Sequence, residues 1–432
     1  MEATRIVERI GKESGFDLEG MEFYIRQAML SAGARVLGQV LDLVGRGRRA
    51  TPLLCANHHV AHPMDSIGLR SKTVRTILGE VEFTRSGYVC PICGQRRYPG
   101  DALLGIVGTV YSPGARRLCS QAGSDFAFGH AAKSLLWYAG LHFDDKEVER
   151  VAERTGVVVE AWMARRGALA LAAPETQESP DTLYVSFDGT GVPMRGAELE
   201  RVKGKNGKAR TRETKLGCVF TQTTVDEKGR PVRDESSTTY VGAIEESRDF
   251  GHRIRQEALR RGMARAGRVV VITDGAAYNK TIIDEHFHHA VQILDLYHTR
   301  EHLADFFRDV LRRDLKTPLH RRLRNLLDAG QIEALLEEMA ALLPRSGTRR
   351  RDGLKQIAYF RRNAHAMRYA EYRRQNLFVG SGVIEAGCRT LVGQRLKNSG
   401  MFWSVRGANA IIALRCCIFS NRFEDFWEAQ AL

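Results

Sequence analysis

The stretch LYVSFDGTGVPM, residues 183 to 194, decides how the rest of the chain is interpreted. An apolar run typical of a buried strand leads to Asp188, and a glycine follows at once. One interpretation is a turn, where Asp and Gly are common. The other is a metal ion held by the carboxylate, with the glycine allowing close approach to the backbone. In either case we expect Asp188 to end the first strand.

From residue 182 onward the pattern predicts strand, strand, strand, helix, strand, helix, strand. The strands are TLYVSFDGT, TKLGCVFTQTTV, SSTTYVGAI, RVVVITDGA and AVQILDLYH. Three strands of antiparallel type, then alternating helices and strands, is the order of an RNase H-like core. The predicted fold class is α/β: an RNase H-like core with a mixed five-stranded sheet and a helical insertion. A small zinc-ribbon-like hairpin and a helical DNA-binding region are expected to precede the core.

A second Asp-Gly pair ends the predicted fourth strand, at Asp274 in VVVITDGAAYN. The first and fourth strands are neighbours in an RNase H-like sheet, so Asp188 and Asp274 are expected to meet at one edge. Two adjacent carboxylates raise each other's pKa unless a cation lies between them, and hard oxygen ligands favour Mg²⁺ or Mn²⁺. Each aspartate alone is explained as well by a turn, but the two together favour a metal site.

Glu385, in GSGVIEAGCR, is the expected third carboxylate. Ser381 is placed to cap a helix, which would put Glu385 one turn into it. The alternative is an exposed Glu385 paired with Arg389 at i,i+4 spacing. His298 follows the fifth strand and is expected to contact phosphate or position a water, or else to be a packing residue. Asp295 either orients His298 or caps the next helix.

The three carboxylates predict a site for two Mg²⁺ or Mn²⁺ ions, which activate the attacking oxygen and stabilise the leaving oxygen at a phosphodiester. The composition agrees with a DNA partner, because the 432 residues carry a formal net charge of +14. A merely basic protein is the alternative. The chain has no apolar run of about eighteen residues and its start, MEATRIVERIGKESG, lacks a signal core. We therefore expect a cytoplasmic protein without a membrane partner.

The region before the core divides into three predicted parts. Residues 1–48 form a helical region that packs on the body or on a second subunit. Residues 50–103 form a hairpin with zinc-ribbon spacing, and residues 104–175 form three short helices that resemble a helix-turn-helix unit, or else a plain helical linker. A Pro-rich linker, APETQESPD, follows.

The hairpin carries a possible zinc site. Cys90 and Cys93 form a CxxC pair, and Cys55 and His58 have the same two-residue gap upstream. Thiolate and imidazole are suitable ligands for one structural Zn²⁺. His59 and His62 compete with His58 as the fourth ligand. The alternative is a metal-free hairpin turn.

The core is predicted in three segments: residues 182–298, a helical insertion at 299–376 and C-terminal helices at 377–432. Basic residues beside the core are the expected DNA contacts, with a solvated hairpin tip as the alternative for the loop that joins the first two strands. In the C-terminal segment, aromatic residues at GQRLKNSGMFWS are expected to stack on an unpaired base or to pack in the core. The DNA-binding residues are Arg201, Lys203, Lys205, Lys208, Arg210, Arg212, Arg395, Lys397 and Trp403.

Four motifs together resemble a bacterial insertion-sequence transposase with a DDE core, closest to the ISKra type. They are SFDGTGVPM, VITDGAAYN, LDLYHTREHL and SGVIEAGCRTLVGQRLKNSGMFWS followed by GANAIIALR. The resemblance covers residues 50 to 430 and implies that Asp188, Asp274 and Glu385 are the catalytic triad. It also implies an insertion domain before Glu385 and a DxxH-like element at Asp295 and His298. The chain departs from the family at CANH, where members tend to have a second CxxC pair.

The predicted function is that of a DNA transposase, which binds terminal inverted repeats, cuts a 3′ end and joins it to target DNA. A homodimer on DNA is expected because two DNA ends must be handled together. One alternative is an RNase H-like metal-dependent nuclease without strand transfer. Another is a zinc-ribbon DNA-binding protein whose catalytic core is inactive.

Overall fold

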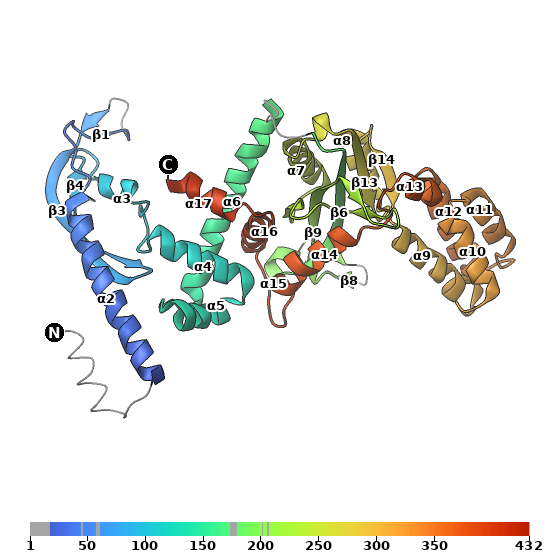
Figure 1. Cartoon of the computed structure of the whole chain (residues 1–432), viewed down its shortest axis with the longest axis horizontal. Coiled ribbons are helices and arrows are strands. Elements are labelled where there is room, and N and C mark those ends of the chain that lie inside the picture. Colours follow the sequence, from blue (N-terminus) through green and yellow to red (C-terminus); the bar gives the residue numbers. More distant parts are fainter. Residues whose placement is uncertain are drawn as a thin grey trace. The chain divides into compact units, whose positions relative to one another are not determined.

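The computed structural model describes residues 18–44, 46–57, 61–172, 179–200, 202–204 and 207–431 (Figure 1). The chain divides into two compact units, Met1–Thr155 with Trp427–Leu432, and Gly156–Phe426. The division falls inside the long helix α6 (Asp145–Ala172). None of the helices in the described ranges is long and apolar enough to cross a membrane.

The first unit is built on an antiparallel hairpin of β3 (Asp65–Thr76) and β4 (Gly79–Val89). Three shorter strands lie in the region of the zinc-binding candidates: β5 (Arg96–Arg97) extends the hairpin, and β1 (Leu54–Cys55) pairs with β2 (His62–Pro63). The predicted N-terminal helix is present as α2 (Leu18–Val44) and packs on β4. The rest of region 1–48 lies outside the described residues, apart from the short stretch 46–48.

The helices predicted for residues 104–175 are present, after a short α3 (Pro99–Leu103). They are α4 (Pro113–Asp125), α5 (Phe128–Ser134) continued by η1 (Leu135–Ala139), and α6. Asp144 caps α6, because its Oδ1 accepts from the Glu147 amide at 2.6 Å while Glu147 Oε2 accepts from the Asp144 amide at 3.0 Å. The linker residues 173–178 lie outside the described ranges.

The second unit contains the predicted five-stranded mixed sheet, in the order β12-β9-β6-β13-β14. In this sheet, β6, β9 and β12 pair antiparallel, and β13 and β14 run parallel to β6. The predicted adjacency of the first and fourth strands is confirmed by the pairing of β6 with β13. The strands are β6 (Thr182–Pro193), β9 (Thr211–Gln222), β12 (Thr239–Ala243), β13 (Arg268–Thr273) and β14 (Val291–Leu294).

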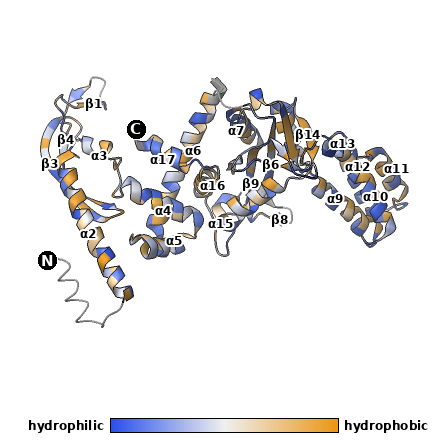
Figure 2. Ribbon diagram, viewed as in Figure 1, coloured by the Kyte–Doolittle hydropathy of each residue, from blue (hydrophilic) through white to orange (hydrophobic). Residues whose placement is uncertain are grey.

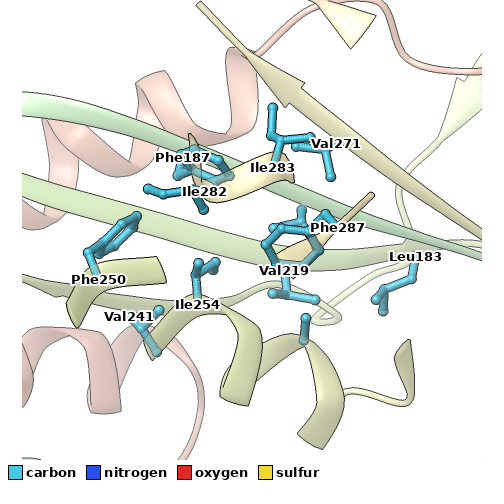
Figure 3. Packing of buried hydrophobic residues seen from close by; sticks show 12 residues of the cluster. Leu183, Phe187, Val219, Val241, Phe250, Ile254, Val271, Ile282, Ile283 and Phe287 are labelled. Carbon is cyan, nitrogen blue, oxygen red and sulfur yellow. The ribbon is translucent and has the colours of Figure 1, made fainter. Parts of the chain in front are cut away.

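Alternate side chains of β6 face two different helical layers. Leu183, Val185 and Phe187 are buried against α7 (Ser247–Arg260) and α8 (Ala277–His286), as Figure 3 shows for part of this cluster. Asp188 lies on the opposite face, where α14 (Gly382–Gly387) and η6 (Cys388–Gly393) contact β6 and α16 (Val405–Phe419) contacts β12. The sheet is therefore a middle layer, and the acids lie on its C-terminal-helix side.

A helical block follows β14, as predicted for residues 299–376. Its interior is apolar, with Phe306, Phe307 and Phe360 fully buried. Its elements are α9 (Leu296–Asp305), η4 (Phe306–Leu311), α10 (Pro318–Asp328), α11 (Ile332–Ala341), α12 (Thr348–Asn363), η5 (Ala364–Ala366) and α13 (Tyr369–Arg374).

Candidate active site

Asp188 lies within β6 and not at its end, so that expectation was wrong. The strand continues through Gly189 to Pro193, paired with β9 throughout. A Cβ at Gly189 would lie 2.5 Å from Glu213 Oε1 and 3.0 Å from the Tyr278 hydroxyl, so a larger residue here would require these two side-chain ends to shift. Asp188 Oδ1 accepts a hydrogen bond from the Gly189 amide at 2.6 Å.

Asp274 follows β13 directly, as expected, and is held by a turn. Gly275 has φ of +81°, the left-handed region that favours glycine. Asp274 Oδ1 accepts from the Ala276 amide at 3.0 Å and from Asn279 Nδ2 at 2.6 Å. The sequence analysis missed Asn279, although its place five residues after Asp274, on the first turn of α8, was a signal that could have found it.

The register of β6 and β13 places the two aspartates level with each other. Ile272 pairs with Ser186 at the end of the parallel ladder. Asp188 lies two residues later within β6, and Asp274 lies two residues later just beyond β13. Residues paired in this way point to the same face of a sheet. The strand pairing therefore agrees with the predicted meeting of the two carboxylates, which stays a prediction.

Glu385 lies in the first turn of α14, one turn after Ser381. Ser381 occupies the cap position, but its hydroxyl donates to Glu385 Oε1 at 2.7 Å instead of accepting from a helix amide. Within the described ranges Glu385 forms no ion pair with Arg389. Glu385 is exposed, as the alternative interpretation expected, but its partner is the Ser381 hydroxyl and not Arg389.

The charges of Asp274, Glu385 and His298 act on Asp188, although in the described structure the carboxylate oxygens of the three acids do not all lie within 4.8 Å of one another. Burial raises the pKa of Asp188 above its usual range, and the charges of Asp274 and Glu385 raise it further, while the Gly189 amide and His298 lower it. No lysine or arginine in the described part of the chain forms an ion pair with any of the three acids. The cluster thus carries uncompensated negative charge, which a cation would neutralise.

The donor set fits hard divalent cations. Each acid uses one oxygen on a protein donor: Gly189 for Asp188, Ala276 and Asn279 for Asp274, and Ser381 for Glu385. Asp274 and Glu385 therefore keep a second carboxylate oxygen for a ligand, whereas the second oxygen of Asp188 has the Cys388 thiol 4.0 Å away. Oxygen is the preferred donor for Mg²⁺ and Mn²⁺.

Cys388 is a neighbour of the acids that the sequence analysis missed. Its Sγ lies 4.0 Å from Asp188 Oδ2. Burial raises the pKa of the Cys388 thiol to about 12, and the charge of Asp188 acts in the same direction. The thiol is therefore neutral at physiological pH and contributes no charge to the cluster. Its position three residues after Glu385, on the same side of a helix, is the signal that could have found it.

Asp295 is the cap of α9 and also a bridge to α14. It is fully buried, its Oδ1 accepts from the His298 amide at 2.7 Å, and its Oδ2 accepts from the Ser381 amide. One carboxylate thus ties the helix start that carries His298 to the turn that carries Glu385. The His298 ring is partly exposed, with Nδ1 3.8 Å from Glu301 Oε2.

Two residues expected to contact DNA are buried, and both expectations are corrected. Trp403 packs in the interior and donates from Nε1 to the Leu396 carbonyl at 3.0 Å. Arg395 is fully buried with its guanidinium 5.1 Å from the centre of the Trp403 ring. The exposed aromatic of this segment is Phe402, which is 63% accessible.

The other expected DNA contacts lie on or near the loop between β6 and β9. Lys397 is exposed and donates to the hydroxyl of Thr190, two residues beyond Asp188. Arg210 is exposed and Arg212 half-buried where the loop enters β9. The backbones of Lys203 and Lys208 pair in the short ladder of β7 (Lys203–Gly204) and β8 (Gly207–Lys208). Arg201 and Lys205 lie outside the described residues.

A separate candidate metal centre lies in the first unit. Sulfur atoms of Cys55, Cys90 and Cys93 lie within 4.8 Å of one another, with 3.8 Å between those of Cys55 and Cys93. Tetrahedral zinc with bonds of about 2.3 Å separates its sulfur ligands by about 3.8 Å, so the three thiols fit this ion. His58 and His59 lie outside the described residues. His62 is the strand partner of Cys55 but does not join the sulfur cluster.

We predict that the purified chain binds one equivalent of zinc and that Cys90→Ser loses it. The remaining ligands are too few to hold the ion, and the hairpin should become more sensitive to heat. The bound zinc is measured by its absorbance with a chromophoric chelator after the protein is denatured. Cys119→Ala, a buried cysteine of the same unit that is remote from the cluster in sequence, should keep the metal. A zinc-free wild type purified without chelators would contradict this prediction.

Comparison with known proteins leaves the family of the chain open. No protein-family model and no curated protein matches it. Among solved structures, a chain of the Drosophila P element transposase strand transfer complex shares 10% sequence identity, with a TM-score of 0.33. The match covers 74% of this chain and 95% of that chain. At this level the similarity carries no weight for fold or function, and the site is defined by its own geometry.

Proposed function

We propose that the second unit is the RNase H-like core of a DNA transposase, of the ISKra type that its motifs resemble. One observation carries the proposal: Asp188 in β6 and Asp274 just after β13 each lie two residues beyond the last pair of the parallel ladder, and the charge of Glu385 acts on Asp188. The sheet order supports the core assignment, and the positive net charge supports a DNA partner.

The residues around the acids have separate roles in this proposal. Asp188, Asp274 and Glu385 would hold two Mg²⁺ or Mn²⁺ ions, which activate the attacking oxygen and stabilise the leaving oxygen during phosphodiester cleavage. Lys397, tied to Thr190 beside Asp188, is placed to contact a DNA phosphate. His298 faces the same cluster and would orient the phosphate or a water molecule.

The test is a strand-transfer assay with the full chain, Mg²⁺ or Mn²⁺, and duplexes from the DNA that flanks its coding sequence. We expect 3′-end cleavage with uncut duplexes and joining to a target plasmid with pre-cut duplexes. Cleavage without joining would favour the nuclease alternative. DNA binding without either reaction, in both metals, would favour the inactive-core alternative and overturn the proposal.

A further inference from the structure

Helix α2 has apolar residues on two opposite sides, and among the residues that the structure describes only one of these sides has a packing partner. Ala34 and Gly38 are buried on the side that packs on β4, where a Cβ at Gly38 would lie 3.1 Å from the Glu82 carbonyl oxygen. Asp42 fixes the same side, because its Oδ1 accepts from the Thr84 amide at 2.8 Å and from the Thr84 hydroxyl at 2.7 Å. The position of α2 on the hairpin is therefore set without its other side.

The opposite side of α2 carries exposed apolar residues, and Figure 2 shows hydrophobic residues along the length of this helix. Met29, Val36 and Leu43 recur every seven residues and are 70%, 58% and 81% exposed. Ile25 precedes Met29 by four residues and Ala32 lies between Met29 and Val36, so the steps from Ile25 to Val36 are four, three and four residues. Between Val36 and Leu43 the corresponding position is the polar Gln39. This is the a/d pattern of a coiled coil, and we call the five apolar residues the α2 seam.

The pattern indicates what covers the seam. Apolar residues spaced by 3.5 residues on average fit the holes of another helix with the same spacing, and a second copy supplies such a helix. The helix has 27 residues, about 40 Å at 1.5 Å per residue. Its exposed aliphatic side chains present on the order of 800 Å² per copy, the area of a stable protein interface.

Charge argues against a membrane or nucleic-acid occupant. Helices that bind anionic lipid surfaces, or DNA, have a basic polar face. The charged residues of α2 are three acidic and two basic: Glu19, Glu22, Asp42, Arg26 and Arg35. The helix is thus slightly acidic, although the whole chain is strongly basic.

We propose that the α2 seam pairs with the α2 seam of a second copy, so that the chain is a homodimer through a two-stranded coiled coil. The pairing does not depend on the acids of the second unit, and it gives a dimer whether or not the chain is a transposase. It supplies a residue-level basis for a dimer, which the sequence analysis expected from mechanism alone.

The test is the mass of the full chain by light scattering after gel filtration, at concentrations down to about 1 µM. We expect twice the single-chain mass of 48.4 kDa for the wild type and the single-chain mass for the double variant Met29→Glu/Val36→Glu, because like charges then face each other across the seam. Leu103→Glu, an equally exposed apolar residue of the same unit away from the seam, should remain a dimer.

Circular dichroism separates dissociation from unfolding, since the substitutions leave the β4-facing side of α2 unchanged. If the double variant loses its cooperative thermal transition, the milder Leu43→Gln replaces it and should raise the dimer dissociation constant by about tenfold or more. The proposal is overturned if the wild type has the single-chain mass at 50 µM, about fifty times the lowest concentration. It is also overturned if the seam variants keep the two-chain mass.

Discussion

Asp188→Asn should reduce metal-dependent DNA cleavage by about a thousandfold or more and should also raise the Tm of the metal-free protein. The loss follows from the removal of a ligand oxygen beside Asp274. The gain follows from the charge: burial, Asp274 and Glu385 raise the pKa of Asp188, so its ionised form costs folding free energy. A rise of about 2–4 °C is expected at pH 7.5 with EDTA, measured by calorimetry.

The pH dependence gives the sign of this effect independently. A carboxyl with a raised pKa contributes stability at low pH and loses it as the pH rises through the folded-state pKa. The Tm advantage of Asp188→Asn should therefore shrink toward pH 4. With Mg²⁺ present, the wild type should gain Tm by ligand binding and the variant should not.

Asp234→Asn is the matched control, because its carboxyl has the opposite shift. Burial raises the pKa of Asp234, but hydrogen bonds from Thr221 and Thr223 outweigh this and leave it lowered. Its ionised form therefore stabilises the fold, and the variant should lose Tm at neutral pH while cleavage is unchanged. Equal Tm changes in the two variants would contradict the electrostatic account of Asp188.

Local patterns predicted the strands and the turn at Asp274, because strand periodicity and turn residues are short-range signals. The order of the strands in the sheet is a long-range property and was expected only from the RNase H-like order of elements. Asp274 followed by Gly275 is a local rule, since the glycine adopts a left-handed conformation. Gly189 lies inside β6, where a Cβ would approach the side chains of Glu213 from β9 and Tyr278 from α8. The Asp-Gly dipeptide thus stands in two different environments, and only the turn at Asp274 can be predicted from neighbouring residues.

The C-terminal part of the site depends on contacts that no local pattern contains. Phe402 and Trp403 are adjacent aromatics, yet one is exposed and the other lies over the buried Arg395. A basic residue next to a tryptophan favours a DNA-binding prediction by composition, whereas the fold buries both as an internal cation–π pair. The carboxylate of Glu385 is placed in the same long-range way, by a turn that Asp295 fixes from another segment.

Asp295→Asn should therefore weaken the site although Asp295 itself is not a proposed metal ligand. An asparagine side chain has one acceptor oxygen, so it cannot accept from both the His298 and the Ser381 amides, and Glu385 loses its fixed position. We expect cleavage and Mn²⁺ affinity, the latter measured by titration calorimetry, to fall by about 10–100-fold. The buried amide left unpaired should also lower stability by about 1–3 kcal/mol.

Two comparisons separate positioning from simple destabilisation. Thr317→Ala removes the cap of α10 in the same unit, so it should cost about 1 kcal/mol while Mn²⁺ affinity stays unchanged. In a Glu385→Gln background, Asp295→Asn should add little further loss of Mn²⁺ affinity, because both substitutions act on one ligand. If the Asp295→Asn variant is less stable but keeps wild-type Mn²⁺ affinity, Asp295 has only a structural role. If the wild type binds no Mn²⁺, the metal site itself is contradicted.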